Sequence, residues 1–145
     1  MAFRFPLHSV LRFREGVEHQ EELELRKVQL EAAAVRRSIE QANMDIAIAQ
    51  QAREAAMRQP IPAAHLQSML RAADAAVEKK KKLLAMLNTL EEQIAGCMQR
   101  YQTAHRKRQM LSDLEARQQD AWEVQQVKAQ QKKLDDLFAA RHQRG

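Results

Sequence analysis

Residues 25–56 read LRKVQLEAAAVRRSIEQANMDIAIAQQAREAA. Apolar side chains recur along this stretch at alternating intervals of three and four residues, and only Arg53 interrupts the row. A heptad row of this length predicts a coiled coil rather than a helix of a globular protein. Such a row needs a partner helix, and we expect the partner later in the same chain. The row consists of Leu25, Val28, Ala32, Val35, Ile39, Ala42, Ile46, Ala49 and Ala56.

The composition is that of long helices. The chain has 145 residues, of which 4% are aromatic and only 3 are Gly and 3 Pro, while Ala, Glu, Gln, Lys, Leu and Arg dominate. This length is enough for one domain, and much of its 45% apolar content is Ala. We therefore expect a linear seam between helices and no concave pocket suited to catalysis.

A single strong break divides the chain. Residues 59–62 read Gln-Pro-Ile-Pro, and each proline disfavours helical geometry in the residue before it. A break this short predicts a hairpin with antiparallel neighbours. We expect one domain over residues 1–145, with helix 1 over about 6–58, a turn at 59–62 and helix 2 over about 63–143. Pro6 suits the first helical turn, where its missing N–H costs nothing.

The expected second helix carries a matching heptad row, interrupted by Lys80 and Arg108. The first helix opens with a broader apolar stripe, and Glu18 and Glu21 then occupy row positions, which predicts loose packing there. The second row consists of Leu66, Met69, Ala73, Ala76, Leu83, Leu87, Leu90, Ile94, Cys97, Tyr101, Ala104 and Leu111. The opening stripe consists of Leu7, Val10, Leu11, Phe13 and Val17.

The second helix is longer than the first. The apolar register slips after Leu111, and pairing with the first helix should end near Asp113. The fold class is therefore all-α: a long two-helix antiparallel coiled-coil hairpin whose longer C-terminal helix overhangs. Residues 114–143 should project as an unpaired helix of roughly 45 Å. This overhang carries Trp122, Val127, Leu134, Leu137 and Phe138, which suggests that another molecule or a second copy covers it.

No catalytic, cofactor-binding or metal-ligating residues are expected. The five histidines form no i, i+4 pair and have no cysteine or paired carboxylates at metal-ligand spacing. Cys97 lies on the seam, which favours a buried structural thiol over a reactive one. Residues 1–13 lack the continuous apolar run of a signal peptide, and no run approaches the ~18 apolar residues of a membrane span. We expect a cytoplasmic protein.

The charge is basic but dispersed. The chain has 24 Lys and Arg against 19 Asp and Glu, a net charge of +5. Interspersed signs favour a solvated charged surface over a clustered nucleic-acid-binding face. Two basic runs, Lys79–Lys82 and Arg106–Arg108, leave an acidic partner open as an alternative.

Both ends of the chain carry short motifs. The opening reads Phe5-x-Leu7-x-x-Val10-Leu11-x-x-Arg14, and the closing motif reads Gln131-Lys132-Lys133-Leu134-Asp135-Asp136-Leu137. In these motifs, in their spacing and in the hairpin with a longer second helix, the chain resembles the flagellar export protein FliJ family over nearly its whole length.

The resemblance implies a non-enzymatic, stalk-like coiled coil similar to the rotor shaft of rotary ATPases. Its implied partners are the hexameric ATPase of flagellar type III export, the membrane export-gate protein and the substrate chaperones. No cofactor and no nucleic acid are implied. The expected location is the cytoplasm, peripherally at the export apparatus of the inner membrane.

Two sets of contact residues are expected. The family's gate-docking pattern is aromatic-x-x-x-Leu-x-x-Ala, and the nearest match is Leu66-x-x-x-Leu70-x-x-Ala73, in which leucine replaces the aromatic residue. The overhang itself suggests the contacts to the ATPase ring. These are Trp122, Gln131, Lys132, Lys133, Leu134, Asp135 and Leu137.

Three alternative functions stay open at this point. The chain could be the stalk subunit of a virulence type III secretion system or of a rotary ATPase. It could also be a basic coiled-coil adaptor for nucleic acid, which would require an affinity that falls steeply with salt.

Overall fold

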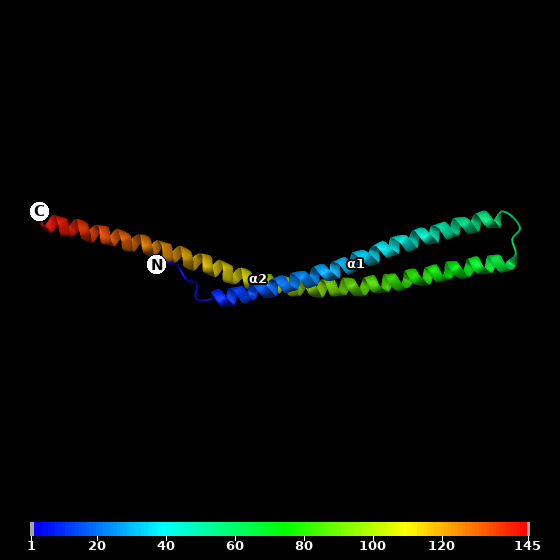
Figure 1. Ribbon diagram of the computed structural model, residues 1–145, viewed down its shortest axis with the longest axis horizontal. Coiled ribbons are helices and arrows are strands. Elements are labelled where there is room, and N and C mark those ends of the chain that lie inside the picture. The colour runs from blue at the N-terminus through cyan, green and yellow to red at the C-terminus, as the bar shows by residue number, and fades with distance from the viewer. Residues whose placement is uncertain (1, 145) are drawn as a thin grey trace. The chain divides into compact units, whose positions relative to one another are not determined.

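The computed structural model describes residues 2–144, which form two helices joined by a short turn (Figure 1). Helix α1 spans His8–Met57 and helix α2 spans Ala63–Arg144. No strand occurs in this range. The predicted all-α fold, a helical hairpin with a longer second helix, is confirmed.

Local hydrogen bonds set where the helices begin and end. Helix α1 begins two residues after Pro6, because the His8 N–H donates to the carbonyl of Phe5 across a turn (3.2 Å). At the start of α2 the carbonyl of Pro62 accepts from the N–H groups of His65 and Leu66, at 3.1 and 3.2 Å. These two bonds satisfy backbone donors that a helix start otherwise leaves unpaired.

Contacts divide the chain into two compact units, of which unit 2 comprises residues 22–100. It contains the turn and the stretches of α1 and α2 on either side of it, which run antiparallel (Figure 1). The heptad positions of both helices are buried or half-buried along these stretches. Ala32 is fully buried at 0% exposure, and the interrupting residues Arg53 and Lys80 are half-buried. The predicted rows therefore form the seam.

Unit 1 comprises residues 1–21 and 101–145. Its buried side chains are Phe5, Leu11 and Ala104. The opening apolar stripe differs from the prediction, because Leu7, Val10 and Phe13 are exposed. Half-buried polar residues occupy the seam positions of this part of α1 instead, and they continue the three-and-four spacing from Leu25 toward the N-terminus. These are Glu21, Glu18 and Arg14.

The heptad spacing of α2 does not slip after Leu111, and that expectation is wrong. The half-buried positions continue at intervals of four, three and four through Glu115, Gln118 and Trp122. Two of these residues are polar, so hydrophobicity alone did not reveal the row. Leu114 is also half-buried, and every described residue from Glu123 onward is exposed. The exposed part of α2 therefore begins after Trp122 rather than at Leu114.

Candidate partner-binding surfaces

A charged cluster lies in the seam of unit 1, where both helices interrupt their apolar rows. Nε of Arg108 donates to Oε2 of Glu18 at 2.5 Å, and Nη2 of Arg108 lies 3.5 Å from Oε1 of the same carboxylate. Nδ1 of His105 lies 3.5 Å from that oxygen. The side chains of Glu18 and Arg108 are only 18% and 23% exposed. Glu18 interrupts the apolar row of α1 and Arg108 that of α2, and each therefore finds its charge and hydrogen-bond partner in the other helix.

The cluster changes the acidity of its carboxylate. The hydrogen bond from Arg108 lowers the pKa of Glu18, against the opposite effect of burial, and His105 adds a smaller lowering contribution. The same bond raises the pKa of Arg108. The lowered pKa of Glu18 and the raised pKa of Arg108 both favour the ionised pair at neutral pH, and this pair joins α1 to α2.

The N-terminal segment packs against α2 within unit 1. Phe5 is buried at 8% exposure, and the ring centroids of Phe3 and Trp122 lie 6.1 Å apart with an interplanar angle of 49°. Trp122 is therefore half-buried rather than free. Trp122 therefore differs from the other predicted ATPase contacts, because its side chain already packs against the N-terminal segment.

The tail segment, defined here as residues 123–144, is the largest continuously exposed part of α2. It carries five exposed large hydrophobic residues, among them Leu134 at 54% and Leu137 at 62% exposure. The predicted contacts Gln131, Lys132, Lys133, Leu134, Asp135 and Leu137 all lie on this segment and are exposed.

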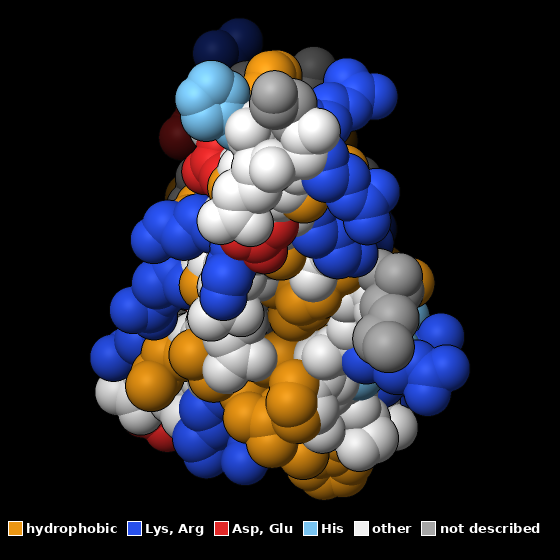
Figure 2. Space-filling view, turned by 90° about the vertical axis from the view of Figure 1, so that its left-hand side faces the viewer, with side chains coloured by type: hydrophobic (Ala, Val, Ile, Leu, Met, Phe, Trp, Pro, Cys, Tyr) orange, Lys and Arg blue, Asp and Glu red, His pale blue; other side chains and the backbone are white. Residues whose placement is uncertain are grey.

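Basic residues outnumber acidic ones on the tail segment, which has Lys128, Lys132, Lys133, Arg141 and Arg144 against Glu123, Asp135 and Asp136. Figure 2 looks along the molecule from the side of the C-terminus and shows hydrophobic side chains between groups of Lys and Arg. The surface combines apolar area with positive charge, as a protein-binding surface does when its partner is in part acidic.

The predicted gate-docking residues lie near the start of α2, in unit 2. Leu70 is 42% exposed, whereas Leu66 and Ala73 occupy seam positions and are half-buried. Their spacing puts Leu70 one helical turn from each of the others. Of the three residues, only Leu70 is exposed to a partner.

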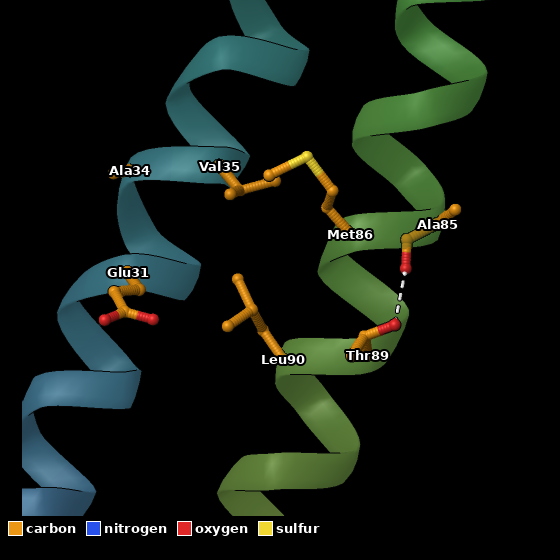
Figure 3. A pocket seen from close by; sticks show the side chains of 7 residues that line it. All are labelled: Glu31, Ala34, Val35, Ala85, Met86, Thr89 and Leu90. Atoms are coloured by element: carbon orange, nitrogen blue, oxygen red, sulfur yellow. Dashed lines mark hydrogen bonds between the residues drawn. The ribbon is translucent and has the colours of Figure 1, made fainter.

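A groove crosses the seam farther along unit 2. The side chains of Val35, Met86 and Leu90 point toward one another from the two helices, and Glu31 and Thr89 lie at its edges (Figure 3). Thr89 donates to the carbonyl of Ala85 at 3.2 Å, so its hydroxyl is already satisfied within α2. The groove has a volume of about 590 Å³ and is lined mainly by apolar atoms. The heptad pattern of either helix does not reveal this groove, because the groove forms only where the two rows meet.

The basic run Lys79–Lys82 wraps around α2. Lys80 is half-buried in the seam, whereas its three neighbours are exposed, and Nζ of Lys81 lies 3.3 Å from Oε1 of Glu78. A run that points in several directions offers no single basic face of the kind that nucleic acid requires.

Metal and membrane sites were also sought over residues 2–144. No group of three or more His, Cys, Asp or Glu side chains in this range could hold a metal ion. No helix within it is both long enough and apolar enough to cross a membrane.

Cys97 is 2% exposed, and Nη2 of Arg100 lies 3.1 Å from its sulfur.

Sequence reasoning missed the role of Phe3 and Phe5. These are two of the four phenylalanines of the chain, and both precede Pro6. Two aromatic residues just before a proline, outside any helix, indicate an extended segment that packs on the rest of the chain. A search for heptad spacing does not detect such a segment.

The model of the family described as "Flagellar FliJ protein" matches residues 3–145. No curated protein and no solved structure matches the chain.

Proposed function

Because the chain belongs to the flagellar FliJ family, a family of export-associated coiled-coil proteins, we propose that it binds the hexameric flagellar export ATPase through its tail segment. We further propose that the start of α2 docks on the membrane export-gate protein and that the chain assists the cycling of substrate chaperones. On this proposal the protein works by contact and hydrolyses nothing itself. Binding to the gate would hold it at the inner-membrane export apparatus.

The observation that carries this proposal is the exposure of the whole tail segment. Most of the stability of a helix in a protein comes from packing of its apolar face, and within the described residues the tail segment has no such packing. The tail nevertheless presents large hydrophobic residues such as Leu134 and Leu137. Exposed apolar residues on a helix are typical of a segment that a partner covers.

The charges around these leucines suit contact with a ring of subunits. Lys132 and Lys133 precede Leu134, and Asp135 and Asp136 follow it. Both signs therefore lie within two turns of the helix, so the segment can meet polar surfaces of either charge. We place Gln131–Leu137 at the centre of the ATPase contact and Trp122 outside it, because Trp122 already packs on Phe3.

The gate contact rests on Leu70. Its side chain is exposed, whereas the half-buried Leu66 and Ala73 hold this part of α2 against α1. We assign Leu70 to direct contact and the other two to positioning.

The test of the ATPase contact is the hydrolysis rate of the export ATPase from the same organism, with and without this protein. We expect a dose-dependent change in rate that is lost in the double variant Leu134→Asp/Leu137→Asp. Leu30→Asp is the matched control, because Leu30 is 72% exposed and lies on α1 in unit 2. An unchanged rate, together with no co-sedimentation of the two proteins, would exclude the ATPase assignment.

The gate contact is tested separately by binding to the cytoplasmic part of the export-gate protein. Leu70→Asp should abolish this binding. Leu84→Asp is the control, because Leu84 is 45% exposed on the same helix, close to the 42% of Leu70. Equal loss in both variants would show that the effect is not specific to the predicted docking residues.

A further inference from the structure

The apolar side chains of the tail segment form a stripe of their own. Val124, Val127, Leu134 and Phe138 follow a spacing of three, seven and four residues, with Gln131 and Arg141 at the intervening and next heptad positions. The four apolar side chains are 53%, 64%, 54% and 72% exposed, respectively. We call these six residues the tail stripe. It is a heptad row without a covering helix in the part of the chain that the structure describes.

The tail stripe is not a continuation of the seam of the hairpin. Trp122 is the last half-buried seam position of α2. Val124 and Val127 follow it by two and five residues, which turns them about 200° and about 140° around the helix. The stripe therefore lies on the face of α2 opposite the seam, where the intramolecular partner of unit 1 does not reach it.

Two hollows along the tail stripe have the form of coiled-coil holes. One is lined by Asp120, Glu123, Val124 and Val127, with Lys128 beside them, and the other by Leu134, Leu137, Phe138 and Arg141. Each set of four is spaced i, i+3, i+4 and i+7, which is the arrangement of four residues that receives one knob from a facing helix.

The charges of the two hollows are complementary to each other. Asp120 and Glu123 line the first together with Lys128, which leaves it a net negative charge, whereas Arg141 is the charged residue that lines the second. An antiparallel copy of the same helix seats its Arg141 in the acidic first hollow and its Val127 in the second, apolar hollow. The same register sets Lys128 of one copy across from Asp135 of the other. All of these contacts occur twice, as a two-fold axis requires.

A parallel arrangement lacks this match. It would stack Gln131 on Gln131 near the middle of the stripe and Arg141 on Arg141 at its C-terminal end, which sets polar groups and like charges against each other. Self-complementarity of the stripe therefore selects the antiparallel arrangement.

We propose that the tail segments of two copies of this chain associate as an antiparallel coiled coil through the tail stripe. The interface is short, about three heptads, so the association is weak and reversible. This proposal does not rest on the assignment to the export ATPase. Because both contacts use Gln131 and Leu134, a tail paired with a second copy is not free to bind the ATPase.

Sedimentation equilibrium of the full chain, from about 1 µM to about 1 mM at low salt, tests the association. We expect the weight-average mass to rise from 16.7 kDa toward twice that value. Val127→Asp and Phe138→Asp should each weaken the dimer about tenfold or more. Leu30→Asp should leave it unchanged, because Leu30 is as exposed as Phe138 but lies on α1. Circular dichroism verifies that each variant keeps its helix content.

A charge exchange tests the arrangement of the two copies. Lys128→Glu and Asp135→Lys should each weaken the dimer, and the two changes combined should restore it, because each residue then meets an opposite charge on the other copy. A chain that stays monomeric up to about 1 mM would overturn the proposal. A dimer insensitive to both aspartate variants would overturn it as well. Failure of the combined exchange to restore association would overturn the antiparallel register.

Discussion

Glu18 and Arg108, 90 residues apart in sequence, form a hydrogen-bonded ion pair of 2.5 Å inside the seam of the hairpin. Each residue interrupts the apolar row of its own helix. A shift of either helix by one heptad would separate the two charges and set Glu18 opposite Tyr101 or Glu115 instead of Arg108, and a half-buried charge without its partner is costly. The pair therefore specifies the register of unit 1, in the way that a polar residue at a core position does in other coiled coils.

A double-mutant cycle measures this coupling. Glu18→Ala and Arg108→Ala should each lower the free energy of unfolding, and the double variant should lose less than the sum of the two. We expect a coupling of about 1 kcal/mol, since both side chains are largely screened from water. Glu22 and Arg26 provide a control cycle, because their pair at 2.7 Å lies on an exposed surface of one helix. Strict additivity at Glu18 and Arg108 would contradict the role in register.

The same pair makes stability depend on pH in the acidic range. Because Arg108 lowers the pKa of Glu18 in the folded chain, the unfolded state binds this proton more readily. The contribution of Glu18 is therefore fully present above the unfolded pKa and is lost as the pH falls through the lower folded pKa. Urea unfolding of the native chain and of Glu18→Gln should show a stability difference that is constant near neutrality and shrinks below pH 4.5, the ordinary pKa of this group. A difference that grew with acidity would contradict the assigned shift.

The packing of Phe3 on Trp122 has a fluorescence signature. Trp122 is the only tryptophan, so its emission reports this contact alone. Phe3→Ala should expose the indole and shift its emission to longer wavelength. Phe13→Ala should leave the emission unchanged, because Phe13 is 64% exposed and its ring faces Arg14 at 5.7 Å. Identical spectra for the native chain and Phe3→Ala would contradict the placement of the N-terminal segment.

Gly16 is a site where α1 can be stabilised. It lies inside the helix, and a Cβ atom built on it meets nothing within 4 Å. Gly16→Ala should therefore raise the free energy of unfolding by about 1 kcal/mol, because alanine loses less backbone entropy than glycine in a helix. Thermal unfolding followed by circular dichroism measures the effect. A lower melting temperature would mean that the space beside Gly16 is needed for packing.

Much of the fold was predictable from the sequence because its causes are local. The three-and-four spacing from Leu25 onward defines one face of a helix, and Pro60 and Pro62 exclude helical geometry at the turn by sterics between neighbours. The seam positions read from the pattern, including the interrupted ones at Arg53 and Lys80, are those that the structure buries or half-buries. These features depend only on residues a few positions apart.

Other features were decided only by the tertiary structure, because they join residues that are distant in sequence. That Glu18 meets Arg108, and that Phe3 reaches Trp122, depends on the register in which the helices pack, which periodicity leaves undetermined. The same packing moves the start of the exposed tail from Leu114 to the residue after Trp122. The sequence by itself determined two helices and the faces that they bury from Leu25 to Ala56 and from Leu66 to Leu111. The register of their pairing, and with it the surface left for partners, followed from which side chains meet across the seam.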